Sequence, residues 1–122
     1  MEQTSWNIKV FTNSGLVNSD LGSLEVDAST IVPVTIPATD TVVLALQLAD
    51  TSKINVFNIT CDKYDATVEV TSDVGTYKLT GPVLLCGETV SCFSANLSTL
   101  SIENKSSDTD AEVTILIGRD LS

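Results

Sequence analysis

Apolar and polar residues alternate with a period of two along most of this chain. Trp6, Ile8 and Val10 alternate with polar neighbours, and the same alternation recurs in residues 32–36 and 42–48. Successive side chains of a strand point to opposite faces, so each run predicts a strand with one buried face. The same pattern predicts further strands at residues 53–61, 66–71, 76–80, 83–86, 89–93, 97–103 and 111–117.

The spacing of the turn signals predicts the fold class. Clusters of Gly, Pro, Asp, Asn and Ser separate the apolar runs, and no run has the apolar stripe of a helix. Turn signals roughly every 8–12 residues are typical of all-β sandwiches and jelly rolls. We therefore expect an all-β, jelly-roll-like β-sandwich of about eight to ten short antiparallel strands. A closed barrel is the alternative. The signals lie at residues 37–40, 50–52, 62–65, 73–75, 81–82 and 104–110.

One predicted strand changes phase. In residues 53–61 the apolar set moves from Ile54 and Val56 to Phe57, Ile59 and Cys61. Either a β-bulge or a strand buried on both faces produces such a shift.

Residues 12–30 differ from the rest of the chain, because Asn, Ser, Gly and Asp interrupt their apolar positions. We expect residues 1–28 to form an N-terminal strand and an arm or long connection, and residues 29–122 to form the sandwich. The apolar residues of the arm either fill the end of the sandwich or reach a neighbouring subunit. The partner-binding candidates are Leu16, Val17, Leu21, Leu24, Glu25, Asp27 and Tyr64.

Charge excludes two classes of partner. The chain has 16 acidic and 6 basic residues and a formal net charge of −10. Its Lys and Arg residues are scattered singly, whereas nucleic acids and anionic membranes attract clustered basic residues. We therefore expect neither partner. The longest apolar run is too short for a membrane span, and the N-terminus lacks a secretory pattern, so a soluble product made in a cytoplasm is expected.

The three cysteines, Cys61, Cys86 and Cys92, leave at least one thiol free within a monomer. If a hairpin turns at Gly87-Glu88, Cys86 and Cys92 are not directly opposite each other. We expect no intramolecular disulfide, and small buried thiols in strands. A zinc site needs more ligands than three Cys without His provide.

Catalytic chemistry has little basis in the sequence. The chain has no His, which excludes Ser-His and Cys-His pairs, and its acids lie mostly at turns. Asp108 and Asp110 resemble a fragment of a calcium loop but lack its Gly and distant Glu. We expect no enzyme activity, no metal and no cofactor. Three N-glycosylation sequons, at Asn58, Asn96 and Asn104, are expected to be chance matches.

Aromatic residues offer one candidate for an exposed contact. Trp6, Phe11 and Phe57 lie among apolar neighbours in predicted strands and are expected in the core. Tyr64 follows Asp62-Lys63 in a turn and is expected to be exposed. A carbohydrate platform would need several exposed aromatics together.

The stretch from Lys53 to Gly118, a little over half of the chain, resembles the small all-β virion proteins encoded beside the capsid genes of tailed bacteriophages. The likeness rests on the order of short segments along the chain. These are the Asp-containing turn Thr60-Cys61-Asp62, a Val-rich strand at 67–71, the turn Gly81-Pro82-Val83-Leu84, the strand TLSIEN at 99–104 and the strand VTILIG at 113–118.

The resemblance implies a capsid decoration, or cement, protein. Such a protein binds the outside of an icosahedral head, has the major capsid protein as its partner, often forms a trimer, and has no catalytic residues. It would be made in the bacterial host cytoplasm and located on the virion. The alternatives are a head-fibre or tail-associated knob, and a carbohydrate-binding adhesion module.

Overall fold

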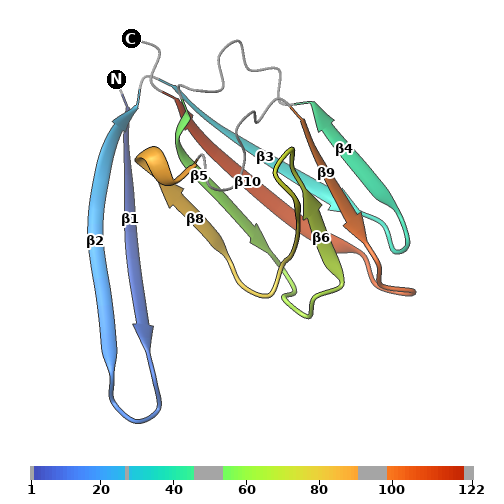
Figure 1. Ribbon diagram of the computed structural model, residues 1–122, viewed down its shortest axis with the longest axis horizontal. Helices are drawn as coiled ribbons and strands as arrows, with labels where there is room; N and C mark the ends of the chain where they lie inside the picture. The colour runs from blue at the N-terminus through green and yellow to red at the C-terminus, as the bar shows by residue number, and fades with distance from the viewer. Residues whose placement is uncertain (1, 27, 46–53, 91–98, 120–122) are drawn as a thin grey trace.

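A computed structural model describes residues 2–26, 28–45, 54–90 and 99–119 of the chain. These residues form ten β-strands in three antiparallel sheets, and one turn of 3-10 helix, η2 (Gly87–Thr89). Figure 1 shows how these elements are arranged. The all-β prediction is confirmed. The strands are β1 (Glu2–Phe11), β2 (Val17–Val26), β3 (Ala28–Ile36), β4 (Thr41–Ala45), β5 (Ile54–Cys61), β6 (Val68–Thr71), β7 (Thr76–Lys78), β8 (Val83–Cys86), β9 (Thr99–Asn104) and β10 (Ala111–Arg119).

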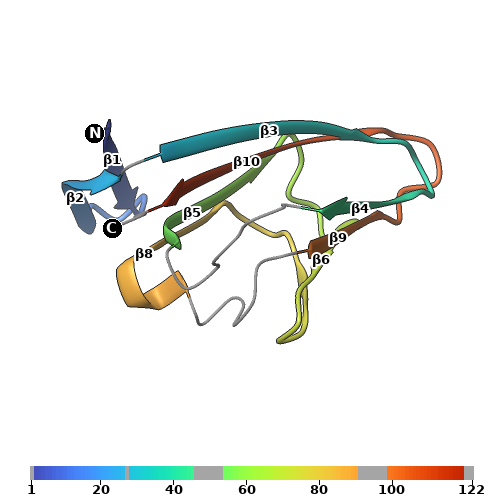
Figure 2. The ribbon, with the colours of Figure 1, turned by 90° about the horizontal axis from the view of Figure 1, so that it is seen from above.

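Eight of these strands make two four-stranded sheets that lie face to face (Figure 2). We call the sheet with strand order β3-β10-β5-β8 the upper sheet and the sheet with order β4-β9-β6-β7 the lower sheet. Along the strands, apolar residues that face the other sheet alternate with residues that face outward, as the period-two pattern predicts, although several outward residues, such as Ile31, Leu84 and Leu116, are apolar too. The structure is therefore compatible with the predicted β-sandwich.

The strand pairs of the sandwich are nested along the sequence. β6 pairs with β7, β5 with β8, β4 with β9 and β3 with β10, so each pair encloses the preceding one. Further pairing of β10 with β5 and of β9 with β6 joins these pairs into the two sheets. The outermost pair has Ala28 opposite Arg119, which places the start and the end of the sandwich side by side.

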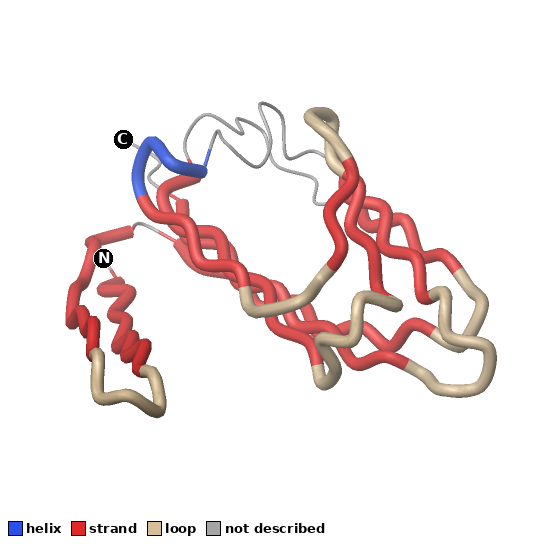
Figure 3. The backbone as a smooth tube through the Cα atoms, turned by 60° about the horizontal axis from the view of Figure 1, so that its bottom comes forward, coloured by secondary structure: helices blue, strands red, loops and turns tan. Residues whose placement is uncertain are grey.

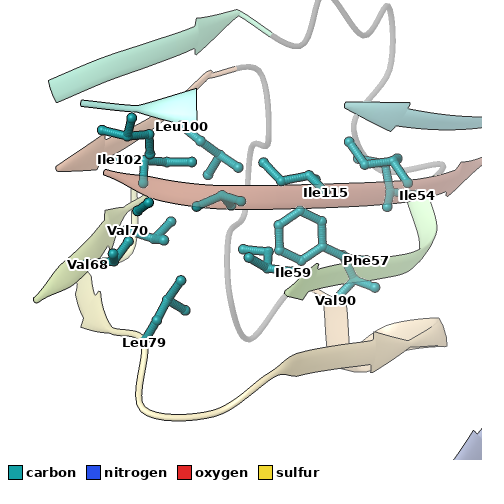
Figure 4. Close-up of a cluster of buried hydrophobic side chains, with 14 residues drawn as sticks. Ile54, Phe57, Ile59, Val68, Val70, Leu79, Val90, Leu100, Ile102 and Ile115 are labelled. Atoms are coloured by element: carbon teal, nitrogen blue, oxygen red, sulfur yellow. The ribbon is translucent and has the colours of Figure 1, made fainter. Parts of the chain in front are cut away.

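The core lies between the two sheets (Figure 4). Phe57, Ile59 and Ile115 of the upper sheet face Leu100 and Ile102 of the lower sheet, and all five side chains are almost completely buried. Close packing of branched apolar residues from two sheets is the main stabilising contribution in a sandwich.

The phase change in β5 has both of the predicted causes. The pairing register with β10 shifts between Gly118, opposite Val56, and Arg119, opposite Ile54, which is a β-bulge. The bulge returns Ile54 to the core side. Val56 is also buried, on the outer side of the sheet, so the strand is buried on both faces at this point.

Two predicted elements are wrong. Residues 17–26 form the regular strand β2, not an interrupted connection, and pair along their length with β1. Thr89 lies in the 3-10 helix η2 and not in a strand that pairs behind a Gly87-Glu88 turn. Val90, the next residue of that predicted strand, is buried in the core but is not in a strand either, and residues 91–93 lie outside the described residues.

Candidate interaction surface

The strands β1 and β2 form a hairpin that stands apart from both sheets (Figures 1 and 3). Its turn is closed by hydrogen bonds from the backbone N–H of Thr12 to the carbonyl of Leu16, at 2.9 Å, and from Gly15 N–H to the carbonyl of Thr12, at 3.1 Å. Gly15 has a φ of 98°, a left-handed conformation that favours glycine. The sequence thus makes a long two-stranded ribbon with a tight end.

The base of the hairpin is anchored to the upper sheet. Val26 at the end of β2 is 1% exposed. A Cβ atom built on Gly118 would lie 3.0 Å from Val26 Cγ1 and 3.3 Å from Val56 Cβ, so the three residues are tightly packed. The absence of a side chain at Gly118 lets Val26 approach β10, and Val26 in turn covers Val56.

One face of the hairpin, which we call the inner face, carries Thr4, Trp6, Ile8 and Val10. Trp6 lies across Gly22, its partner on β2, and its indole Nε1 donates a hydrogen bond to Asp20 Oδ2 at 2.8 Å. A β-carbon at residue 22 would overlap the Trp6 ring. This arrangement holds the only tryptophan of the chain in the hairpin and outside the core.

An open apolar groove of about 520 Å³ separates the inner face from the outer side of the upper sheet. Trp6 and Ile8 form its hairpin wall, while Pro82, Leu84 and Leu116 form its floor on the sheet. None of its lining residues is charged; the others are Thr4, Ser5, Asn7, Val10, Val56 and Asn58. A lining of this kind is typical of a site that binds apolar groups of a ligand or partner.

The end of the hairpin exposes large apolar side chains. Phe11, Leu16 and Val17, which we call the tip, are 68%, 71% and 60% exposed. Phe11 pairs with Val17, and Leu16 ends the turn beside them. On the outer face of the ribbon, Leu21 is 76% exposed. Monomeric proteins rarely leave such a group of apolar side chains in water, so the hairpin has the composition of an interaction element.

The structure brings together most of the predicted partner-binding residues. Leu16, Val17 and Leu21 are exposed on the hairpin, and Leu24 is half-buried on its inner face. Glu25 belongs to β2, opposite Gln3, and Asp27 lies outside the described residues.

Tyr64 is not part of this surface. It follows β5 at the end opposite the hairpin base, packs against the core, and accepts a hydrogen bond from the backbone N–H of Cys61 at 3.0 Å. Its predicted exposure is therefore wrong, because its hydroxyl closes the turn after β5.

Sequence reasoning missed Ile8, Val10 and Phe11 as surface residues. The prediction that Phe11 lies in the core is wrong, and Trp6 is half-buried on the hairpin, whereas Phe57 is fully buried as predicted. The signal available in the sequence was the uncharged stretch from Val10 to Ser19 in an acidic chain.

The described cysteines are Cys61 and Cys86, and both are free thiols. Burial raises the pKa of each thiol above the ordinary value of 9.0. Nearby carboxylates, Asp62 at Cys61 and Asp20 at Cys86, raise these pKa values further. Both thiols are thus held in the protonated form, which is unreactive as a nucleophile. Cys92 lies outside the described residues.

Two acidic residues of the β9–β10 loop hold this loop together and join it to the β3–β4 turn. Asp108 Oδ1 accepts hydrogen bonds from the hydroxyls of Ser106 and Thr109, at 3.2 and 3.0 Å. Asp110 Oδ1 accepts one from the backbone N–H of Ala38 at 3.2 Å. Within the described ranges no three metal-ligating side chains come together, and no helix there has the length and apolarity to cross a membrane.

The exposed aromatic side chains of the described chain are Phe11 and Tyr77, and they lie in different sheets. Phe11 is at the tip of the hairpin, and Tyr77 lies in β7 at the edge of the lower sheet. Tyr77 lines a shallow depression with Lys78 and Pro82. A glycan platform stacks several aromatics at one place, which these two residues do not provide.

Comparison with known proteins adds no relative. No family model, no curated protein and no solved structure matches the chain. The functional argument therefore rests on the geometry of the hairpin, the groove and the sandwich.

Proposed function

We propose that this protein is a virion structural protein that decorates and stabilises the outer surface of a phage capsid, with the major capsid protein as its partner and no enzymatic activity. The observation that carries the proposal is the projecting hairpin, which holds six of the ten exposed large apolar side chains among the described residues. A rigid sandwich with an apolar projecting element suits a protein that links neighbouring subunits of a shell.

We infer that the strand order corresponds to a jelly roll. Nested strand pairs wound into two four-stranded sheets are what a single long hairpin produces when it is rolled up. Jelly rolls occur both in viral capsid proteins and in lectin domains. The inference therefore supports the capsid proposal and its two alternatives, a head-fibre or tail knob and a carbohydrate-binding module.

The hairpin favours the capsid proposal over carbohydrate binding. Its exposed residues Phe11, Leu16, Val17 and Leu21 are mainly aliphatic and form a surface that suits protein contact. The outer face around Leu21 is the part of the hairpin that we assign to the capsid protein. Lys9, on the same face, lies 5.8 Å from the centre of the Phe11 ring.

The test is cosedimentation of the purified protein with assembled, undecorated heads from a panel of tailed phages. We expect saturable binding, and at least a tenfold weaker affinity for Leu21→Asp, because an ion would be buried in an apolar contact. Val43→Asp is the matched control, since Val43 is 67% exposed on the other sheet. Absence of binding to every head, together with binding to a glycan panel, would transfer the assignment to the carbohydrate module.

A further inference from the structure

The groove beneath the hairpin is open to solvent and lined mainly by apolar side chains. Its wall is the inner face of the hairpin, with Trp6 and Ile8, and its floor is the outer side of the upper sheet, with Leu84 and Leu116. The floor continues across the sheet, because Leu116 pairs with Ile31 on one side and with Asn58 on the other. Ile31 is 61% exposed, so apolar surface extends from the groove to the edge strand β3.

The hairpin cannot fill this groove with its own tip. The wall of the groove consists of residues 4–8 and Val10 of β1, and these residues pair continuously with β2 up to Phe11 opposite Val17. Folding the tip back onto its own strand would break that pairing. Among the described residues, the tip that faces this groove must therefore come from another molecule.

The tip and the groove match in charge. The segment from Val10 to Ser19 has no charged residue, and neither has the lining of the groove, although 18% of the residues in the chain are charged. Contact between two uncharged surfaces buries apolar area without removing an ion from water. Asp20 adjoins the groove but accepts the hydrogen bond of Trp6 Nε1, and no acidic side chain lines the groove itself to pair with a basic partner, which the net charge of −10 would attract.

The groove also suits a β-ribbon. It is bounded on one side by a two-stranded ribbon and on the other by a sheet. A second ribbon between them would meet apolar side chains on both of its faces. The tip meets this requirement, because Phe11 and Val17 share one face of the ribbon and Val10 lies on the other.

We propose that the occupant of the groove is the hairpin tip of a second copy of this chain. Phe11, Leu16 and Val17 of one copy pack between Ile8 and Leu84 of the next. Each copy carries both the tip and the groove, so the contact is head to tail, and it repeats until a ring closes or a chain grows. The inference rests on the proposed function only in taking the hairpin as the binding element, and it leaves the outer face with Leu21 free for the capsid.

Analytical ultracentrifugation of the full chain without heads tests the proposal. We expect wild-type protein to sediment as an oligomer, and the tip variant Leu16→Asp to sediment with the monomer mass. The groove variant Leu84→Glu should do the same. Ile8→Glu, on the hairpin wall, repeats this test at a position outside the sandwich. Val43→Asp should keep the wild-type mass. A monomeric wild-type protein, or tip and groove variants that retain the wild-type mass, would overturn the proposal.

Mixing the two kinds of variant separates head-to-tail contact from other modes of association. Leu16→Asp retains an intact groove and Leu84→Glu retains an intact tip, so the mixture should form one-to-one complexes that grow no further. If the mixture stays monomeric, the tip does not bind the groove.

Salt dependence distinguishes a second copy from a basic partner. Copies with a net charge of −10 repel each other, and salt screens this repulsion, so self-association should strengthen as salt is added. Weakening by salt would contradict the proposal. Oligomers that do not bind heads would refute the proposed function alone, whereas monomers that bind heads through the hairpin would refute this inference alone.

Discussion

At the residue scale, Asn104 at the end of β9 joins three segments of the sandwich. Its side chain is completely buried, and its Nδ2 donates to the carbonyls of Ile36, at 3.0 Å, and Thr109, at 2.8 Å. Its Oδ1 accepts a hydrogen bond from the backbone N–H of Ser106 at 3.0 Å. Because this amide is buried in the folded protein, a glycan cannot be attached to it there. The asparagine of this sequon instead holds the three segments together.

Replacing Asn104 should destabilise the sandwich strongly. Asn104→Ala removes the partner of the buried Ile36 carbonyl and of two part-buried groups, the Thr109 carbonyl and the Ser106 N–H, and we expect a loss of about 3 kcal/mol in the free energy of unfolding. Urea unfolding measures this loss. The neighbouring exposed residue provides the control, since Ser107→Ala should change stability by less than about 0.5 kcal/mol. Equal stability of the two variants would contradict the role of the amide.

The single tryptophan reports on the hairpin separately from the core. In Gly22→Ala the new methyl group overlaps the Trp6 ring and should displace it, breaking its hydrogen bond to Asp20. We expect red-shifted tryptophan fluorescence and easier quenching by acrylamide, with little change in the melting temperature of the sandwich. Ser19→Ala, exposed on the other face of β2, should leave the spectrum unchanged.

The thiols should react slowly in the folded protein. Burial raises the pKa of Cys61 and Cys86, so the reactive thiolate is scarcer than in the unfolded chain. We expect both to be alkylated more slowly at pH 8 in buffer than in urea, as measured by mass spectrometry. Because the pKa of each thiol is higher in the folded protein than in the unfolded chain, their contribution to stability is fully present below pH 9.0. It is lost as the pH rises through the folded-state pKa. Faster alkylation in buffer would show that the thiols are activated.

At the scale of elements, the hairpin and the sandwich are separable, because β1 and β2 pair only with each other. Their connection is Val26, which covers Val56 beside Gly118. This arrangement combines the two expectations for residues 12–30. The end of the segment contributes to packing, whereas its middle projects away from the sandwich.

Removal of the hairpin should leave a folded protein. Deleting residues 1–26 removes Val26 and exposes Val56 to water. We expect this loss of apolar burial to lower the free energy of unfolding by about 2 kcal/mol. We expect circular dichroism to retain a strand spectrum and urea unfolding to remain cooperative at a lower midpoint. Loss of all structure would show that the hairpin belongs to the core.

The elements differ in how far the sequence could predict them. A strand such as β10, with Val113, Ile115 and Ile117 buried in the core at every second position, carries the periodicity that identifies a strand with one face in the core. β2 lacks it, because both faces of an isolated ribbon meet water and Asn18, Asp20 and Gly22 carry no burial requirement. Local turn residues were therefore mistaken for a break in the strand.

At the scale of the whole molecule, the nested strand pairing could not be predicted from the sequence. Alternation shows which side chains of a strand are buried, but it does not identify the strand beside it. β3 and β10 lie at opposite ends of the sandwich sequence and pair over nine residues. The groove could not be predicted for the same reason, since Trp6 and Leu116, which both line it, are distant in the sequence and come to one place only in the folded protein. What the sequence did indicate was the hairpin's apolar residues Leu16, Val17 and Leu21.

Distant pairing also predicts slow folding. To pair β3 with β10, the chain must close a loop that contains most of its residues, and the entropy of that closure is lost before the contacts of the two strands form. Sandwiches with such distant pairing fold in milliseconds to seconds. Stopped-flow refolding, monitored through the burial of Tyr64 beside the core, should give times in this range. Refolding within microseconds would contradict the nested pairing.

The corner where Ala28 meets Arg119 determines how the protein carries mechanical load. If the hairpin is pulled while the C-terminus is held, both forces act at the same end of β3–β10, and the hydrogen bonds of this pair open one after another. If the hairpin is pulled while the loop before β10, at Asp110, is held, the forces act on β3 and β10 at opposite ends of the pair, because Ala111 pairs with Ile36. The bonds between the two strands are then loaded in shear. Antiparallel bonds lie perpendicular to the strands, so they resist this load together. A sandwich anchored by its hairpin at one end and by that loop at the other would thus resist tension along β3 and β10.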